Sequence, residues 1–461
     1  MTHVEQDLRD LDRRFVFHPF TALAEHEAHG GPAMIVSGSG SRLYGSDGRE
    51  YLDAMAGLWC VNVGYSRPEL ADALAEQAAR LPYYHAFSSM ATDQPARLAE
   101  RVLDLAGHSM SKVFFGNSGS DANDTQMKLV WLYNNLLGRP RKKKIISRLR
   151  GYHGVSIASA SLTGLPAMHA DFDLPLPMVR HVRAPYRLWE ARPGENDAAF
   201  SARLAAELEA RILAEDPATV AAFIAEPLQA AGGVVVPPAG YFPAIQEVLD
   251  RHDVLMIADE VVTGFGRLGE WFGSDVLDVR PDLMTVAKGI TSGYVPLSAC
   301  MVGDRVWSVL SDPSAGQFQH GYTYSGHPLA AAVAMANLDV IEGEDLVARA
   351  GRQGETLRSA LTEAFADHPI VGEVRGMGLV AAVEFVADRD PMTRLDPALK
   401  VGARVTRECL DRGVITRALP AADTISFSPP FVVSDDEIDT MVTVAREAAD
   451  AVSDQLARER A

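Results

Sequence analysis

The stretch Asp282-Leu283-Met284-Thr285-Val286-Ala287-Lys288-Gly289 is a short apolar run that ends in a lysine. Similar runs recur between residues 112 and 303. They are Lys112–Gly116, Lys144–Ser147, Val179–Val182, Val220–Glu226, Val254–Asp259, Leu283–Ala287 and Leu297–Val302. Most of them are continuous rather than alternating, which is typical of strands buried on both faces. Helical stretches such as 121–137 and 241–252 lie between them, so we expect an α/β fold with a doubly wound, mostly parallel, seven-stranded sheet.

The flanking segments have an α+β pattern. Ser66-Arg67-Pro68-Glu69 and Ser434-Asp435-Asp436-Glu437 have the spacing of capping boxes that open helices, the first running through Leu81. Long helices are expected over 327–341 and near 344–366. Strand-like runs follow at Val371–Val374, Leu379–Phe385, Val414–Leu419 and Thr424–Ser428. A chain of this length predicts two domains: a large α/β domain at 61–330, and a small α+β domain built from 1–60 and 331–461.

The composition is that of an ordinary globular protein. The chain has 461 residues, of which 47% are hydrophobic and 23% charged, and its net charge is −18. An acidic chain lacks the basic face that nucleic-acid binding needs. The basic run 139–144 leads into apolar residues and is interpreted as a solvated turn before a strand. Cys60, Cys300 and Cys409 have neither metal nor disulfide spacing, and no signal or membrane-spanning segment is evident, so we expect a cytoplasmic protein.

Two carboxylates and a lysine follow consecutive predicted strands: Glu226, Asp259 and Lys288. Ligands of open α/β sheets bind at these strand ends. Burial there would lower the pKa of Lys288, and a neutral amine is a nucleophile toward carbonyls. The alternative is a lysine that extends from the strand end to water. Asp259 could pair with Lys288 as a structural ion pair, or with a protonated ring nitrogen of a cofactor.

The stretch Phe114-Phe115-Gly116-Asn117-Ser118-Gly119-Ser120-Asp121 follows a predicted strand and opens a helix. Ser118, Gly119 and Ser120 would present backbone N–H groups and hydroxyls to an anion such as phosphate. The alternative is a serine N-cap with glycines for the turn.

Two stretches resemble known binding motifs but lack the surrounding residues that those motifs require. Gly264-Phe265-Gly266-Arg267-Leu268-Gly269 matches G-x-G-x-x-G, but no helix opens at its third glycine, so it is interpreted as a shaped loop. His26-Glu27-Ala28-His29 lacks the i, i+4 histidine spacing of a zinc-binding helix. The sequence therefore predicts no metal site.

The chain resembles the class III aminotransferases, which are fold type I pyridoxal-phosphate enzymes with an aspartate-aminotransferase-like fold. It is most similar to their amine:pyruvate, or ω-transaminase, branch, over nearly its whole length. The motifs that carry the resemblance occur in order, at 57–65, 117–123, 151–154, 226–227, 259–267, 287–289 and 323–328.

The resemblance implies roles for the cofactor residues. Lys288 would form the Schiff base with pyridoxal phosphate and then shuttle a proton, and Asp259 would keep the pyridine nitrogen protonated. Tyr152 would stack on one face of the cofactor ring and Val261 would press on the other. The phosphate would be held by Ser118, Gly119 and Ser120. Glu226 would support this arrangement. Tyr322 and Thr323 would reach the phosphate of the neighbouring subunit, so the site is expected to be completed in a homodimer, with a dimer of dimers as an alternative.

The resemblance also implies a substrate pocket. Arg417 stands where the branch carries an arginine for the carboxylate of the oxo-acid. Trp59 and Phe87 would line the amine side, with Phe20 and Ala231 as weaker candidates, which suits an apolar or arylalkyl amine. Relatives of the branch often carry a tyrosine where this chain has Ala167, and this departure predicts a roomier pocket.

Several functions remain open on the sequence. The expected reaction transfers an amino group from a primary amine to an oxo-acid such as pyruvate. The donor could instead be an ω-amino acid such as β-alanine or 4-aminobutyrate. An aminomutase, decarboxylase or epimerase would use Lys288 and Asp259 alike. A non-catalytic pyridoxal-binding regulator would need a partner or nucleic-acid module that the acidic sequence does not suggest.

Overall fold

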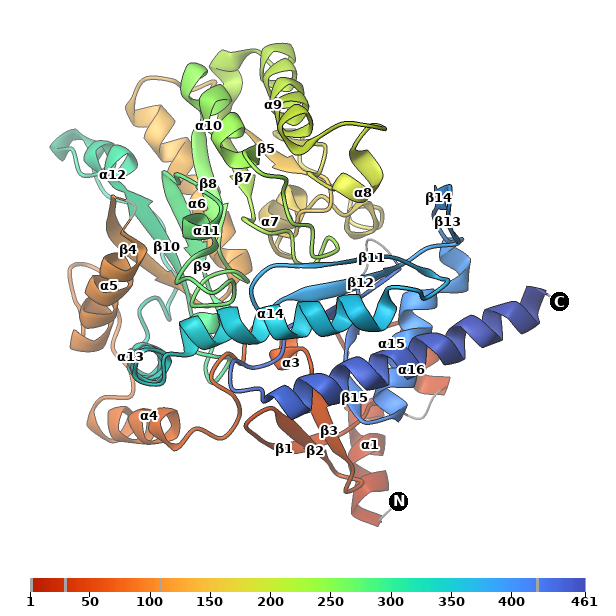
Figure 1. The fold of residues 1–461 in the computed structure, drawn as a ribbon. Helices are drawn as coiled ribbons and strands as arrows, with labels where there is room; N and C mark the ends of the chain where they lie inside the picture. Colours follow the sequence, from red (N-terminus) through yellow and green to blue (C-terminus); the bar gives the residue numbers. More distant parts are fainter. Residues whose placement is uncertain (1–2, 29–30, 108, 420–422, 461) are drawn as a thin grey trace.

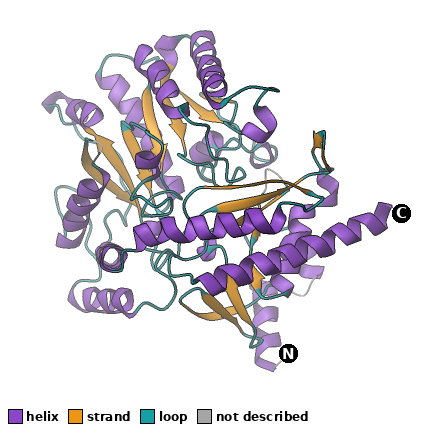
Figure 2. Ribbon diagram, in the orientation of Figure 1, coloured by secondary structure: helices purple, strands orange, loops and turns teal. Residues whose placement is uncertain are grey.

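Figure 1 shows the computed structural model of the chain, which describes residues 3–28, 31–107, 109–419 and 423–460. The strands gather in two regions (Figure 2). One is a large sheet with helices on both sides. The other is a group of smaller sheets, along which the long helices α14 (Leu346–Phe365) and α16 (Asp435–Arg460) run.

The large sheet has seven strands in the order β4-β10-β9-β8-β7-β5-β6. It is parallel except for β10, which runs antiparallel to both β4 and β9. All seven predicted runs are strands of this sheet, so the predicted fold class is confirmed. Their bounds are β4 (Met110–Gly116), β5 (Lys144–Arg148), β6 (Val179–Val182), β7 (Val220–Ala225), β8 (Leu255–Asp259), β9 (Leu283–Val286) and β10 (Ser298–Gly303).

Strand β7 shows why helices cover both faces of this sheet. Every residue of β7 is buried. Phe223 belongs to the same hydrophobic cluster as Leu249 of α10 (Tyr241–Arg251). Ala222 and Ile224 belong to the cluster of Val130, which lies on α6 (Gly119–Leu136). Alternate side chains of a strand point to opposite faces, so a continuous apolar run needs apolar partners on both sides.

The smaller sheets join distant parts of the chain. One four-stranded sheet has the order β1-β2-β3-β15, a second has the order β11-β12-β17-β16, and β13 (Asp388–Arg389) and β14 (Met392–Thr393) form a two-stranded sheet. Parallel pairing of β15 with β3 brings Val414 opposite Leu52, so an N-terminal and a C-terminal segment share a sheet. The domain division at residues 61 and 330 stays a prediction. The strand bounds are β1 (Ile35–Ser39), β2 (Arg42–Gly45), β3 (Glu50–Asp53), β11 (Val371–Gly376), β12 (Ala381–Phe385), β15 (Val414–Ile415), β16 (Arg417–Ala418) and β17 (Thr424–Phe427).

The predicted strand Val414–Leu419 is wrong as a single element. The chain leaves the first small sheet after Ile415 and enters the second at Arg417, with Thr416 between them. The run, mostly β-branched and apolar around Arg417, gives no sign of such a change of partner, because either sheet satisfies its backbone hydrogen bonds.

One of the two predicted capping boxes is also wrong. Helix α4 spans Pro68–Arg80 and its N-cap is Arg67, while the hydroxyl of Ser66 donates to the carbonyl of Gly38 at 2.5 Å. Proline at the first helical position needs no N–H partner, so the helix starts without the serine cap. The box at Ser434 is confirmed: its Oγ accepts from the N–H of Glu437 at 3.2 Å, and its N–H donates to that carboxylate at 3.0 Å.

The basic run 139–144 is not solvated throughout. It does form the turn before β5, but Lys142 is buried and its Nζ donates to the carbonyl of Asp253 at 2.7 Å. Further helices of the described chain are α1 (His3–Phe15), α2 (Leu23–Ala28), α3 (Ala56–Trp59), α5 (Asp93–Ala106), α7 (Ile157–Leu162), α8 (Arg187–Glu190), α9 (Asp197–Ala214), α11 (Gly273–Val276), α12 (Asp304–Leu310), α13 (Pro328–Gly343) and α15 (Val401–Asp411). Within the described ranges, no helix has the length and apolar character that crossing a membrane requires.

Candidate active site

A cavity of about 1040 Å³ opens at the carboxyl ends of β7, β8 and β9. Glu226, Asp259 and Lys288 all line it, as their places at consecutive strand ends predict. The other predicted site residues that line it are Phe20, Trp59, Ser118, Gly119, Ser120, Tyr152, Ala167, Ala231, Val261 and Arg417. The structure therefore brings together most of the predicted site.

Three predicted residues lie outside this cavity in the single chain: Phe87, Tyr322 and Thr323. Phe87 is 45% exposed. The hydroxyl of Tyr322 donates to the carbonyl of Asp121 at 3.0 Å, and the carbonyl of Thr323 accepts from Tyr83 at 2.7 Å. The predicted roles of Tyr322 and Thr323 at the phosphate of a neighbouring subunit, and of Phe87 on the amine side of the pocket, stay predictions.

Asp259 is the buried acid of the cavity, with 3% of its surface exposed. Its Oδ2 lies 2.7 Å from Nδ1 of His153 and accepts from Nδ2 of Asn123 at 2.8 Å. Its Oδ1 accepts from the N–H of Val261 at 3.1 Å. Contacts to both oxygens of one carboxyl group fix its direction.

Sequence reasoning gave no role to His153 or Asn123. Both line the cavity, and Asn123 Oδ1 in turn accepts from the hydroxyl of Thr285 at 2.9 Å. The Nε2 atom of His153 is buried without a hydrogen-bond partner among the described atoms. Both residues lie in motifs that carry the family resemblance, at 117–123 and 151–154, and this is the indication of a role that the sequence contains. The aspartate that they contact is more than 100 residues away in sequence.

Lys288 follows β9 and presents its amine to the cavity. Its Nζ lies 5.3 Å from the centre of the Trp59 ring. Burial by the cavity walls lowers the pKa of Lys288 below its ordinary value. Within the described residues, no ion pair joins Lys288 to Asp259, which counts against a structural lysine–aspartate pair and in favour of an acid and an amine that face a bound group.

The loop before α6 serves as a helix cap and leaves donors for an anion. The Oγ of Ser118 accepts from the N–H of Asp121 at 3.2 Å, and the Asp121 carboxylate accepts from the N–H of Ser118 at 3.1 Å. In the described chain, the N–H groups of Gly119 and Ser120 have no hydrogen-bond partner, as expected for the first turn of a helix. The cap and the anion site are therefore compatible, because they use different N–H groups.

Val261 lies against this helix start. A Cβ atom on Gly119 would come within 3.0 Å of Cγ2 of Val261, so glycine allows the β8 loop to approach the helix. Ser120 faces the motif at 151–154 through its Oγ, which accepts from the N–H of Val155 at 3.1 Å. The helix start, the strand end and the Tyr152 loop are thus held together around one space.

Glu226 acts on the backbone of the cavity wall. Its Oε1 accepts from the N–H of Tyr152 at 3.0 Å and its Oε2 from the N–H of Ala230 at 3.1 Å. Burial raises its pKa. The carboxylate therefore holds Tyr152 and the turn that carries Ala231, a contact that the sequence did not reveal.

Arg417 and Trp59 form the other wall. The guanidinium carbon of Arg417 lies 5.1 Å from the centre of the Trp59 ring. Burial lowers the pKa of Arg417, and the Tyr152 hydroxyl acts in the opposite direction. No carboxylate of the described chain pairs with Arg417. A half-buried guanidinium without a counter-ion is suited to an anionic ligand.

The glycine-rich stretch 264–269 shapes the fold beside the cavity. Arg267 is fully buried and donates to the carbonyl of Pro429 at 2.7 Å and to Oδ1 of Asn62 at 2.8 Å. Glu260 accepts from the N–H of Ser274 at 2.6 Å and from the N–H of Gly273 at 2.9 Å. These contacts tie the loop to both sheet regions, in agreement with its interpretation as a shaped loop.

Comparison with known proteins agrees with this geometry. The sequence model of the family "Aminotransferase class-III" matches residues 23–448. The chain is 50% identical to a diaminobutyrate–2-oxoglutarate transaminase of Halomonas elongata, over 99% of this chain and 98% of that protein. It is 46% identical to a mitochondrial gamma aminobutyrate transaminase 1 of Solanum lycopersicum, over 96% and 87%.

Solved structures show the same likeness. The structure of the omega transaminase of Pseudomonas jessenii in complex with PMP superposes with a TM-score of 0.94 and 45% identity, covering 97% of this chain and 98% of that one. The match in sequence and fold extends over the cavity and both sheet regions. The chain therefore belongs to the class III aminotransferases, enzymes that use pyridoxal phosphate.

Proposed function

We propose that this aminotransferase moves the amino group of a primary, apolar or arylalkyl amine to a small oxo-acid such as pyruvate. The observation that carries the proposal is the wall made by Arg417 and Trp59. Arg417 offers one cation without a carboxylate partner in the described chain, and Trp59 offers a large apolar face. One wall thus suits both an acid and an apolar amine, which occupy the pocket in turn.

The residues of the cavity fit pyridoxal phosphate. When bound, this cofactor supplies an aldehyde that takes up the amino group and a ring that accepts electrons. The free N–H groups at Gly119 and Ser120 suit its phosphate, and the Asp259 carboxyl group suits a protonated ring nitrogen. An ion pair at about 4 Å gains roughly 4 kcal/mol at an effective dielectric of about 20, enough to hold that proton at neutral pH.

Each of these residues would then have a defined part. Lys288 would bind the cofactor through its amine and afterwards carry the proton to and from the substrate carbon that bears the nitrogen. Tyr152 and Val261 would cover the two faces of the ring. Glu226 would support Tyr152 through the backbone contact that the structure contains.

The enzyme is also proposed to act as a homodimer. Phe87, Tyr322 and Thr323 would complete the cavity of a partner subunit, and pairs of dimers remain an alternative. Subunit mixing tests this. A heterodimer of Lys288→Ala and Thr323→Ala subunits would regain one intact site if Thr323 serves its partner. Activity no higher than in the parent homodimers would place Thr323 in its own subunit.

A second function is supported by a second cation. Arg150 also lines the cavity, although its NH1 donates to the carbonyl of Gly232 at 3.1 Å and its guanidinium lies 4.8 Å from the Tyr186 ring. An ω-amino acid donor carries a carboxylate far from its amine, and Arg150 could meet it. The substrates named for the relatives in Halomonas and tomato, diaminobutyrate and gamma aminobutyrate, are of this kind.

A half-reaction assay separates these functions. The holoenzyme is mixed with 1-phenylethylamine, β-alanine, 4-aminobutyrate or 2,4-diaminobutyrate, and the loss of the cofactor's visible band is timed. Pyruvate or 2-oxoglutarate is then added to restore the band. We expect the largest kcat/KM with the arylalkylamine and pyruvate. A larger value with an amino acid donor would assign the second function instead. The predicted cytoplasmic location has no bearing on this assay and stays a prediction.

A further inference from the structure

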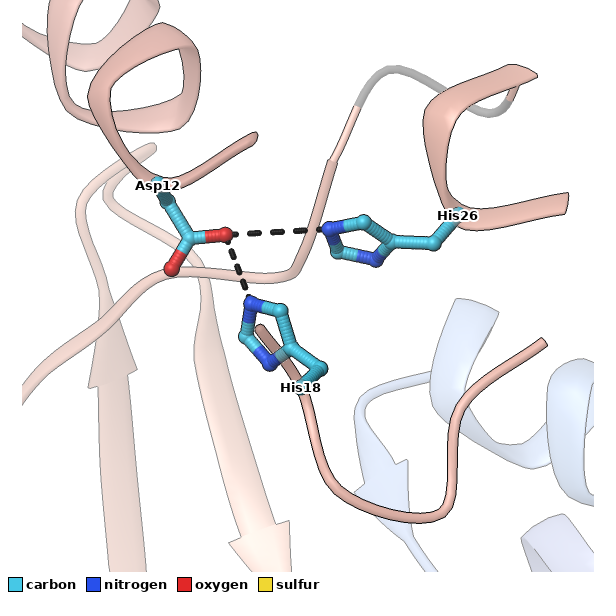
Figure 3. Close-up of side chains that lie close together, drawn as sticks. All are labelled: Asp12, His18 and His26. Carbon is cyan, nitrogen blue, oxygen red and sulfur yellow. Dashed lines mark hydrogen bonds and ion pairs between the residues drawn. The ribbon is translucent and has the colours of Figure 1, made fainter. Parts of the chain in front are cut away.

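Asp12, His18 and His26 converge near the N-terminus, outside the cavity residues that the proposed reaction uses. Figure 3 shows the two imidazole rings directed at the same carboxylate oxygen. Nε2 of His18 lies 2.7 Å from Oδ1 of Asp12, and Nε2 of His26 lies 3.7 Å from it. The three potential ligand atoms all lie within 4.8 Å of one another.

An ordinary ion pair does not account for the second histidine. Nε2 of His18 makes one short hydrogen bond with Asp12 Oδ1, whereas Nε2 of His26 is buried and has no hydrogen-bond partner among the described atoms. The three side chains are 12–25% exposed, so the cluster is partly buried. The nearest carboxylate oxygen, Asp12 Oδ1, lies 3.7 Å from it, beyond hydrogen-bond reach, and leaving a buried imidazole nitrogen unpaired costs free energy.

The surrounding segment is held by polar surface contacts such as the Arg13–Glu27 pair, which joins α1 to α2 at 3.4 Å. Asp12 lies on α1, His18 on the following loop and His26 on α2. No residue of α2 is buried, and neither are the described side chains of α1. Small segments without an apolar core are commonly held by a metal ion or a disulfide.

We propose that Asp12, His18 and His26 bind one divalent transition-metal ion, with zinc the best match and water as the fourth ligand. Two imidazoles and a carboxylate are an ordinary ligand set for zinc, with bonds of about 2.0–2.2 Å. Tetrahedral ligands at that bond length lie about 3.3 Å apart. The two histidine–aspartate separations of 2.7 and 3.7 Å lie on either side of this value, and the two histidine nitrogens lie within 4.8 Å of each other, so side-chain movements alone can close the site around an ion.

The ion would fasten α1 to α2 and thereby fix the loop between them. That loop carries Phe20, which lines the active-site cavity although it is 72% exposed. The metal is thus inferred to be structural, holding the N-terminal hairpin over the cavity mouth. This role is the same whichever amine the enzyme uses.

Zinc chloride titrated into the untagged, pyridoxal-phosphate-loaded enzyme tests the proposal by calorimetry. One ion per chain is expected, with binding weakened at least about tenfold in Asp12→Asn, His18→Gln and His26→Gln. A matched control is His252→Gln, because His252 pairs with one carboxylate, Glu209 Oε1 at 3.0 Å, and has no second histidine. The control is expected to bind zinc as the parent does.

Two further measurements keep the proposal open to refutation. Zinc-edge X-ray absorption on the parent enzyme should show two imidazole nitrogens and light oxygen ligands; a sulfur ligand at about 2.3 Å would place the ion at a cysteine and overturn the proposal. Zinc should also slow hydrogen exchange over residues 9–28 in the parent but not in His26→Gln. No binding, or binding equal in all variants, would likewise overturn it.

Discussion

Nδ1 of His153 lies 2.7 Å from Oδ2 of Asp259, at the carboxyl end of β8 and against the active-site cavity. This contact joins a loop after β5 to the strand end that carries the acid. Asp259 is thereby aimed into the cavity before any ligand arrives. Preorganised charge of this kind needs no rearrangement during a reaction.

Loss of this contact should weaken catalysis without emptying the site. We expect His153→Gln to lower kcat about 10- to 100-fold, because a hydrogen bond to a charged group contributes about 1.5–3 kcal/mol. The pH dependence of the cofactor's absorption should shift as well, since a misdirected Asp259 holds the ring proton less well. His181→Gln is the control, because His181 contacts the carbonyl of Leu162 at 3.3 Å and does not line the cavity. Equal effects of the two substitutions would reduce His153 to a structural role.

Replacement of Lys288 by alanine should abolish turnover and the visible band of the bound cofactor. The reason is that no other lysine lines the cavity of the described chain. Lys112→Ala provides the control, because Nζ of Lys112 lies 5.5 Å from the Trp307 ring, much as Lys288 lies near Trp59, but away from the cavity. A Lys288→Ala enzyme that still transaminates would contradict the assignment.

Lys288 should also make the stability of the cofactor-free protein depend on pH. Its pKa in the folded chain lies below the ordinary 10.5, so the unfolded chain binds the extra proton first as pH falls. Stability is therefore lost from pH 10.5 downward until the lowered pKa is passed, at about 1.4 kcal/mol for each pH unit between the two pKa values. Cofactor-free Lys288→Met should melt at a higher temperature than the parent at pH 7, and this difference should narrow toward pH 10.5. A difference that does not vary with pH would refute the burial argument.

Arg417 should determine the acceptor more than the donor. We expect Arg417→Ala to raise the KM for pyruvate about 10- to 100-fold, because it removes a charge-assisted hydrogen bond worth about 1.5–3 kcal/mol. The KM for an arylalkylamine should change little. Arg417→Lys keeps the charge without the planar guanidinium, so its KM for pyruvate should lie between those of the parent and of Arg417→Ala. Arg394→Ala is the control, because Arg394 also stacks on a tryptophan, 4.2 Å from the Trp189 ring, but does not line the cavity. Unchanged pyruvate kinetics in Arg417→Ala would contradict the role.

Trp59 should set the size of amine that the pocket accepts. Trp59→Ala removes a buried ring that lies against Lys288 and Arg417, so kcat/KM should rise for bulkier amines relative to 1-phenylethylamine. Removal of a buried aromatic ring costs about 3–5 kcal/mol, and the melting temperature should fall. Trp59→Phe keeps an aromatic wall and should alter the preference less. If kcat/KM changed more for pyruvate than for the amine, Trp59 would belong to the oxo-acid side of the pocket instead of the amine side.

Part of the active site could be predicted from the order of residues in the sequence. Glu226, Asp259 and Lys288 were predicted to meet because each follows a buried strand, and parallel strands end at one edge of a sheet. The sequence does not predict the contacts of His153 and Asn123 with Asp259, because these depend on how loops fold back over that edge. Phe87, Tyr322 and Thr323 lie outside the cavity of one chain, and one sequence does not show which surface of a second chain they would meet.

Periodicity and composition by themselves determined the seven-stranded sheet, its helices and the strand ends that carry the acid and the amine. These features depend on local burial patterns, which the order of residues records directly. Tertiary structure alone decided the rest. It divided Val414–Leu419 between two sheets, removed the cap at Ser66, and placed Asp12, His18 and His26 around one point. Those outcomes depend on contacts between separate elements, and no local spacing encodes them.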